Sequence, residues 1–334
     1  MRMSPQKKKP PGHVTASMFY KHLACPHWLY FDVYGDQKLK KPNSAFTEKL
    51  IAQGIEHEEK ILAERGPYVE VKARGNPAKF KKTLALMKEG VPRIYHGLLM
   101  DGDMLGEPDL LERRDDRPSD LGPYHYVAID IKSGEELNDS HRFQLVCYGE
   151  LLKAVQGVRP EDGYVLNRSG ALLSFSLRES EQQFHAALEE VRRILGGEVP
   201  PPQVSSGCKQ SPWFDQCIAL AEKTDDIALL YNVRKKAVKE LREKGVRTVD
   251  DALHIDIERL ADGSEHLSKR LLERMVLQAA ALKEKRHFIR RPIDLPDAPL
   301  EIFFDIEGDP LEGIEYLFGF WVRSIDSPAK YEYQ

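Results

Sequence analysis

The chain has 334 residues, of which 41% are hydrophobic and 31% charged, the composition of a globular protein long enough for two or three domains. Its formal net charge of −4 neither demands nor excludes a nucleic-acid partner, because a locally basic channel is enough to bind one. No apolar run is long enough to span a bilayer, and the basic start MRMSPQKKKPPG lacks the apolar core of a signal peptide, so we expect a cytoplasmic protein with no membrane partner.

The first part of the chain, up to about residue 200, mixes helical and strand patterns. Helical periodicity runs over 44–64, 140–155 and 179–195. Strand-like runs occupy 68–72, 94–100, 104–111 and 124–132, and a strand pair spans 162–177. We therefore predict an α/β fold, a mixed β-sheet flanked by helices.

The pattern from about 224 to 289 is helical throughout and rich in charge. Basic residues crowd the stretch 232–247, and 245–253 after it looks like a small helix–turn–helix unit that grips a nucleic-acid backbone. A basic helix is more often a solvated face than a DNA contact, and both interpretations stay open. The candidate nucleic-acid-binding residues are Arg234, Lys235, Lys239 and Arg242.

After a linker at 294–299, a strand-like run at 300–308 carries Asp305 and Glu307, and a second follows at 316–322. Side chains at i and i+2 of a strand share a face, so these two acids are expected to point the same way.

Two short motifs carry the chemistry. The first is Gly106-Glu107-Pro108-Asp109, and the second places Asp130 and Lys132 two positions apart in an apolar run. In a strand these two side chains share a face, with Ile131 buried behind them. If 105–111 is a neighbouring strand, Asp109 can share a divalent cation with Asp130, and Lys132 would orient the metal-bound water or stabilise charge on a phosphate. The alternative is an ordinary exposed strand edge with a salt bridge.

Three further motifs accompany these two. They are Cys25-Pro26-His27-Trp28-Leu29-Tyr30, Gly54-Ile55-Glu56-His57-Glu58 and Gln144-Leu145-Val146-Cys147-Tyr148. With the two acidic motifs they occur in the order found in the RecB-like branch of the PD-(D/E)XK nucleases, which the first 220 or so residues resemble. The resemblance implies a restriction-endonuclease-like core.

The resemblance also implies roles. Asp109 and Asp130 bind Mg²⁺ or Mn²⁺, which hard oxygen ligands suit better than zinc. The carbonyl of Ile131 is a further oxygen ligand, and His57 joins the metal shell. Gln144 and Tyr148, one helical turn apart, orient Lys132 and the scissile strand. Against this, His57 can be a solvated helix residue, Gln144 a surface residue and Tyr148 a core residue.

The cysteines pose a separate question, since disulfides are poorly supported in an intracellular chain. In relatives, one N-terminal and three C-terminal cysteines hold a [4Fe–4S] cluster. Cys25, Cys208 and Cys217 match three of these places, and Ser211 stands where the fourth is expected. Either Ser211 is an oxygen ligand or the cluster is lost, and three leftover cysteines in a packed lid explain the pattern equally well. Cys147 is expected in the core, and the aromatic residues near the other three are expected to pack around them.

The layout is similar to that of bacterial putative nucleases in which a RecB-like domain, a helical spacer and an RNase H-like DEDD exonuclease domain follow one another. We accordingly predict domains at 1–222, 223–292 and 293–334, the second a helix-hairpin-helix-like spacer. Asp305 and Glu307 match the first motif of the exonuclease domain, whose later acids would lie beyond Gln334. We therefore expect a truncated domain and an inactive second site.

The prediction for function is a metal-dependent nuclease that hydrolyses DNA phosphodiester bonds, as an exonuclease on single strands or ends, in repair or recombination. DNA is the expected partner, and no helicase partner is identified. The alternative is a catalytically silent nucleic-acid-binding fragment of a larger nuclease whose active RNase H-like domain is missing. The two hypotheses differ in whether Lys132 is needed for cleavage.

Overall fold

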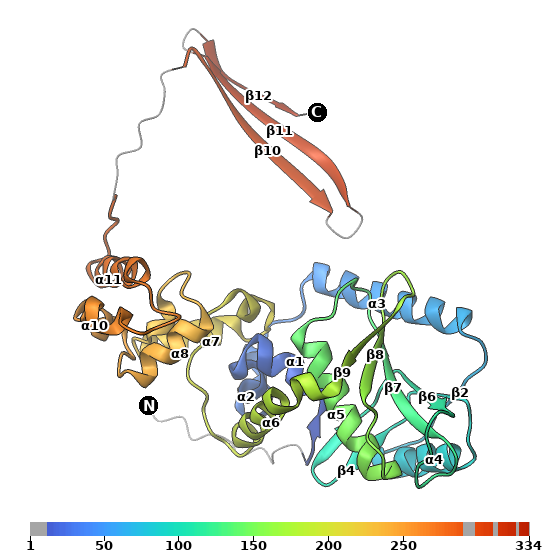
Figure 1. Ribbon diagram of the computed structural model, residues 1–334. Coiled ribbons are helices and arrows are strands. Elements are labelled where there is room, and N and C mark those ends of the chain that lie inside the picture. Colours follow the sequence, from blue (N-terminus) through green and yellow to red (C-terminus); the bar gives the residue numbers. More distant parts are fainter. Residues whose placement is uncertain (1–11, 290–297, 310–312, 325–326, 334) are drawn as a thin grey trace. The chain divides into compact units, whose positions relative to one another are not determined.

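The computed structural model describes residues 12–289, 298–309, 313–324 and 327–333 and divides at residue 284 into two compact units (Figure 1). The expected domain boundary between 292 and 293 lies outside the described residues, as do the basic first 11 residues and most of the linker. Of the helices within the described ranges, none combines the length and the apolar character needed to cross a membrane.

The first unit is built on a six-stranded mixed sheet in the order β2-β3-β6-β7-β8-β9. Its strands are β2 (Val69–Glu70), β3 (Arg93–Tyr95), β6 (Leu110–Arg114), β7 (His125–Ile131), β8 (Asp162–Leu166) and β9 (Leu172–Ser176). β7 is antiparallel to β6 and parallel to β8. The parallel pair needs a crossover, which α5 (Asp139–Gln156) supplies.

Helices cover both faces of β7, and every residue of this strand is buried. On one face, Ile61 and Leu62 at the end of α3 (Ala45–Glu64) pack against Ile129 and Ile131. On the other, α5 packs on the sheet, and α1 (Ala16–Ala24), α2 (Pro26–Tyr34) and α6 (Glu181–Leu195) pack beside it (Figure 1). The predicted fold class, a mixed sheet flanked by helices, is confirmed at this level.

The prediction of a single strand over 104–111 is wrong, and the difference matters for the site. The first half of this range, β5 (Met104–Gly106), pairs with β1 (Val14–Thr15) and β4 (Leu99–Asp101) in a separate three-stranded sheet. Pro108 has no N–H for a ladder and restricts the residue before it, so the chain leaves one sheet there and enters the other at Leu110. Asp109 therefore lies in the connection. The run expected at 94–100 is broken as well, at His96, whose φ is 53°.

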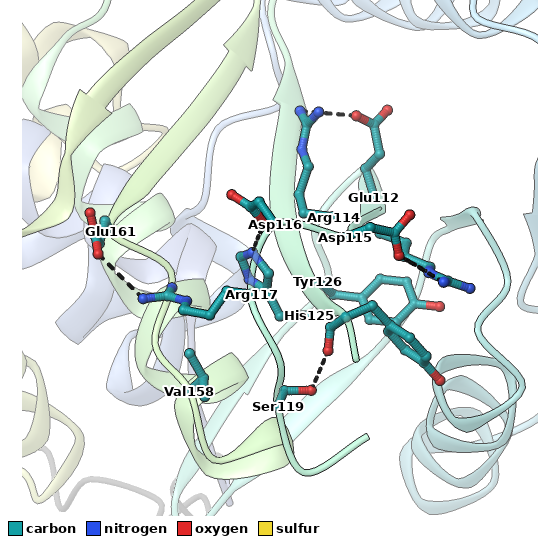
Figure 2. Close-up of polar contacts among 12 residues, drawn as sticks. Glu112, Arg114, Asp115, Asp116, Arg117, Ser119, His125, Tyr126, Val158 and Glu161 are labelled. Carbon is teal, nitrogen blue, oxygen red and sulfur yellow. Dashed lines mark hydrogen bonds and ion pairs between the residues drawn. The ribbon is translucent and has the colours of Figure 1, made fainter. Parts of the chain in front are cut away.

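Polar contacts at the far end of the β6–β7 hairpin hold its connecting loop (Figure 2). His125 Nε2 lies 2.8 Å from Asp116 Oδ1, and the Ser119 hydroxyl donates to the Tyr124 carbonyl at 2.6 Å. Arg117 reaches across to Glu161 at 3.3 Å. These contacts support the register in which Leu110 is opposite Ile129, and a slip of one residue would turn every side chain to the other face.

The segment from 227 to 284 has a hydrophobic core of its own, formed by short helices. They are α8 (Lys235–Glu243), α9 (Val249–Leu253), α10 (Ile257–Ala261) and α11 (Lys269–Glu284), preceded by α7 (Phe214–Lys223). The expected helical pattern ends earlier than 289, at Glu284, and turns interrupt it, two of them at Asp225 and Asn232, which have positive φ. The unit also contains α4 (Asn76–Lys88) and the 3₁₀ turns η1 (Gln37–Leu39), η2 (Leu177–Ser180), η3 (Ser206–Gln210) and η4 (Ile227–Leu229).

The second unit is an antiparallel sheet of β10 (Leu300–Asp309), β11 (Ile314–Ser324) and β12 (Ser327–Tyr333), in that order. Both expected strands are confirmed and extend further than predicted. Asp305 is opposite Gly319 and Glu307 is opposite Leu317, just before an irregularity in the register. Both acidic side chains are exposed.

Candidate functional site

The two acids and the lysine of the sequence motifs come together at one end of the β6–β7 pair. Because Leu110 is opposite Ile129, the residue before it, Asp109, falls opposite Asp130. Asp109 Oδ2 accepts a hydrogen bond from the backbone N–H of Ile131 at 2.6 Å. The Lys132 ammonium lies 3.0 Å from Asp130 Oδ2 and 4.0 Å from Asp109 Oδ2. The connection that carries Asp109 thus places it opposite Asp130, as the predicted strand was expected to do.

Asp130 is the most unusual group of this site. Its side chain is 1% exposed, so the alternative of an exposed strand edge is wrong. Oδ2 is paired with the Lys132 ammonium, and Oδ1 has no hydrogen-bond partner within the described residues. A buried carboxylate oxygen without a partner is costly, and in native proteins such groups are paired or coordinate a metal.

The charges of the site influence one another strongly. Burial raises the pKa of Asp109 to about 7, and the charge of Asp130 adds to this, while Lys132 and the Ile131 N–H oppose it. Burial by itself lowers the pKa of Lys132, but the charges of Asp130 and Asp109 outweigh burial and raise it. Lys132 is therefore an ammonium group at neutral pH. The elevated pKa of Asp109 thus reflects its burial first and the neighbouring charge of Asp130 second.

These residues fit a hard divalent cation. Two carboxylates from adjacent strand ends converge, one of them has an oxygen without a hydrogen bond, and oxygen ligands are what Mg²⁺ and Mn²⁺ prefer. Ile131 contributes its N–H to Asp109, and a role for its carbonyl stays a prediction.

Tyr148 on α5 is buried against the Gly106 motif. Its hydroxyl donates to the Glu107 carbonyl at 3.3 Å, and a Cβ at Gly106 would lie 2.7 Å from the ring carbon Cδ1. Glycine at 106 is therefore what allows the ring to pack there. Burial raises the pKa of Tyr148, which remains a neutral phenol. Gln144 is half-buried, and its side chain has no hydrogen-bond partner among the described residues.

Sequence reasoning chose His57 on α3, but its neighbour Glu58 is the residue in contact with the site. Glu58 Oε1 accepts from the Tyr95 hydroxyl at 2.9 Å and lies 3.4 Å from His96 Nε2. The His96 backbone N–H donates to the Asp109 carbonyl at 3.1 Å, so Glu58 and Asp109 are linked through one residue. His57 has a buried Nε2 without a partner and makes no hydrogen bond or ion pair with the acids or Lys132 in the described structure.

This network has its own electrostatics. The hydrogen bond from His96 lowers the pKa of Glu58, and the charge of Lys132 contributes. The same bond raises the pKa of His96, with Asp109 adding to the effect. The sequence did hold a signal for Glu58. His57 and Glu58 are adjacent on a helix and face different directions, so Glu58 was the alternative to His57 as the residue that points at the sheet.

Cys25, Cys208 and Cys217 form one buried cluster with Trp28, Phe31 and Phe214, and Cys147 lies in the main core as expected. The sulfurs of Cys25 and Cys217 are 3.6 Å apart, and all four thiols are free. Ser211 is buried, and its hydroxyl accepts the Trp213 backbone N–H at 3.1 Å. The Ser211 hydroxyl is thus engaged by a backbone N–H, and the [4Fe–4S] cluster stays a prediction.

One other cluster could hold a metal. Among the described residues, the group of three side chains whose ligand atoms all lie within 4.8 Å of one another is Glu150, Glu181 and His185. Arg159 lies 2.8 Å from Glu150 and 3.1 Å from Glu181. A cation there would have to compete with the guanidinium, so we do not consider this cluster further.

The four basic candidates of the spacer, Arg234, Lys235, Lys239 and Arg242, all line a single groove, away from the acidic pair. Two of them have structural partners. Lys235 donates to the Leu23 carbonyl at 2.7 Å, and Arg242 pairs with Asp226 at 2.7 Å. Arg234 and Lys239 are exposed.

No protein-family model matches this chain, and no curated protein matches it.

Proposed function

We propose that the chain is a RecB-like PD-(D/E)XK nuclease that hydrolyses DNA phosphodiester bonds with Mg²⁺ or Mn²⁺. The observation that supports this best is the buried Asp130 carboxylate, which has its Oδ1 without a hydrogen bond, falls opposite Asp109 and lies 3.0 Å from Lys132. Such a group is stabilised by a bound cation, and two acids beside a lysine suit attack on a phosphate.

The arrangement of the elements supports the same proposal. An antiparallel pair, β6–β7, is followed by the crossover helix α5 and a strand parallel to β7, with the acids at one end. This order suits a restriction-endonuclease-like core. We further propose that 223–292 is a spacer, on the strength of its separate core, and that the sheet containing Asp305 and Glu307 begins an RNase H-like domain.

Each residue then has a defined role. Asp109 and Asp130 hold the cation, which when bound supplies Lewis acidity and lowers the pKa of its water. Lys132 keeps its proton at neutral pH, so it holds the water or stabilises charge on a phosphate oxygen, and it does not act as a base. Tyr148 positions the 106–109 connection through the Glu107 carbonyl. Glu58 holds His96, whose backbone in turn holds that of Asp109.

The test is cleavage of end-labelled single- and double-stranded DNA with Mg²⁺ or Mn²⁺. We expect metal-dependent products from the wild type and a loss of roughly 100-fold or more in Lys132→Ala, the size of effect seen when one charge-stabilising group is removed. Lys153→Ala, an exposed lysine on α5, is the matched control and should cut normally.

Binding of the same DNA with metal chelated should be nearly equal in all three proteins. Cleavage that survives in Lys132→Ala would contradict the proposed site. Binding without cleavage by any of the proteins would favour the alternative, a nucleic-acid-binding fragment without catalytic activity of its own.

A further inference from the structure

The groove lined by the spacer's basic residues lies in the first unit and has a volume of about 1110 Å³. We call it the junction groove. It is formed by the end of α6 with 190–198, the segment 200–209, and the segment 228–243 that includes α8. This volume is at the upper end of the range of about 300–1,000 Å³ usual for small-ligand pockets, so the junction groove has room for a segment of a polymer.

Its charge is strongly one-sided. Five cations on its lining are exposed and have no ion pair within the described residues: Lys209, Arg234, Lys236, Lys239 and Arg247. The acids on the lining are Glu190, Glu198 and Glu243. Glu190 lies 3.1 Å from His22 Nε2 and Glu198 lies 3.8 Å from Arg193, and the five exposed cations outnumber the three acids. The net field of the groove therefore attracts an anionic partner.

The walls of the groove are held in place by the two basic residues that have structural partners. Arg242 joins α8 to both Asp226 and the carbonyl of Pro202, at 2.7 and 2.6 Å. Lys235 reaches the Leu23 carbonyl at 2.7 Å. Arg242 and Lys235 thus hold the walls of the groove in place. The exposed cations are not needed for this and remain available to a ligand.

An aromatic side chain is presented at the same groove. Tyr231 is 81% exposed, the highest value among the large hydrophobic and aromatic side chains of the described residues. Its backbone is anchored, because Gln278 on α11 donates to the Tyr231 carbonyl at 3.2 Å and Arg274 donates to the next carbonyl, that of Asn232, at 2.9 Å. An exposed ring on an anchored backbone, beside cations without ion pairs, is a combination that suits single strands, in which bases stack on rings and phosphates meet basic side chains.

We propose that the junction groove binds single-stranded nucleic acid, with an unpaired base stacked on Tyr231 and phosphates bound by Arg234, Lys236 and Lys239. A duplex has its bases already stacked and cannot offer one to the ring, which is why a single strand is favoured. This inference names the form of substrate and so rests on the proposed function for its biological meaning. The binding itself does not require the acidic site to be active.

The experiment measures fluorescence anisotropy of a labelled oligothymidine of about 16 nucleotides, within the site sizes known for single-strand binders, with metal chelated so that nothing is cleaved. Tyr231→Ala should weaken binding about 5- to 100-fold, the range for loss of one stacking ring. Tyr231→Phe keeps the ring and should bind like the wild type. Equal binding by the alanine variant would overturn the stacking role.

Salt dependence tests the cations. For single strands, the slope of log K against log salt becomes shallower by about 0.7 for each phosphate that the protein no longer neutralises, so the triple variant Arg234→Gln, Lys236→Gln, Lys239→Gln should have a slope shallower by about 2. The control triple, Lys81→Gln, Lys88→Gln, Lys153→Gln, removes the same charge from exposed positions on α4 and α5 and should keep the wild-type slope. An unchanged slope in the groove triple would overturn the assignment of its three cations to phosphates.

Competitors identify the partner. A single strand should displace the probe better than a duplex of the same length or polyglutamate, and an RNA of the same sequence shows whether the sugar matters within the single-strand class. Duplex or polyglutamate competing equally would overturn the proposal. If the groove variants bind poorly while the wild type cuts DNA, the nuclease proposal is unaffected. If the wild type binds single strands specifically but does not cut DNA, the groove proposal stands and the nuclease proposal is rejected.

Discussion

Asp109→Asn should stabilise the metal-free protein, and by more at pH 8 than at pH 5. The pKa of Asp109 rises on folding from its ordinary 3.8 to about 7, because burial and Asp130 disfavour its charge. An acid whose pKa is higher in the folded state holds its proton more tightly there. Its contribution to stability is therefore complete below 3.8 and is lost as the pH rises from 3.8 through about 7.

The size of the loss follows from the two pKa values. At about 1.4 kcal/mol per pH unit, the loss between pH 5 and pH 8 is about 2.5 kcal/mol. Asparagine cannot ionise and can still accept the Ile131 N–H. The free energy of unfolding of the variant relative to the wild type should therefore increase by about 2.5 kcal/mol from pH 5 to pH 8.

Urea unfolding with chelator at the two pH values measures this difference. Asp101→Asn, an exposed acid on β4, is the control and should show no such dependence. Adding Mn²⁺ at pH 8 should raise the stability of the wild type and narrow its gap to Asp109→Asn, because a ligand of the folded state stabilises it. If the difference in the free energy of unfolding between Asp109→Asn and the wild type is no larger at pH 8 than at pH 5, the electrostatic account of the site is refuted.

Three further outcomes are expected. Gly106→Ala should cost about 1–3 kcal/mol in urea unfolding because its Cβ would lie 2.7 Å from the Tyr148 ring, whereas Gly54→Ala, on α3 with no atom within 4 Å, should be neutral or stabilising. Glu112→Gln should cost about 1.5–3 kcal/mol at pH 7, because the buried carboxylate lies within 3.1 Å of three partly exposed arginine side chains. The pKa of Glu112 is lowered by these partners against the effect of burial, so this difference should shrink in acid as the carboxylate protonates. Native protein should react with a thiol reagent at far below four equivalents at pH 8, since all four cysteines are buried. The hydrogen bond with Cys208 lowers the pKa of the Cys25 thiol, but the bond with Cys217 and burial together raise it to about 11. Four fast-reacting thiols before unfolding would contradict the buried cluster.

The local elements and the three main site residues were predictable from the sequence. Apolar periodicity located the helix now seen at Ala45–Glu64 and the buried strand at His125–Ile131. The alternation of side chains along a strand brought Asp130 and Lys132 to one place, and their salt bridge of 3.0 Å agrees with it. These features depend on residues near one another in the chain, where a periodic pattern carries the information.

Other features were decided by packing between distant segments. Glu58, and not His57, contacts Tyr95 and His96 because of the side of α3 that faces the sheet. That side is determined by the contacts of Ile61 and Leu62 with strands more than 40 residues away. Whether Asp130 is a surface ion pair or a buried charge depended on α5 closing over β7.

The junction groove is the clearest case of information that the sequence lacks locally. A charge count marks 232–247 as basic but does not separate Arg242, which holds the wall, from Lys239, which is free to bind. That distinction arises only when Asp226 and the Pro202 carbonyl come within reach of one guanidinium. Composition and periodicity thus determined the elements and the acid–lysine site, while burial and long-range partners decided which charged groups are structural and which remain available for function, because a charge acquires its energy from its surroundings.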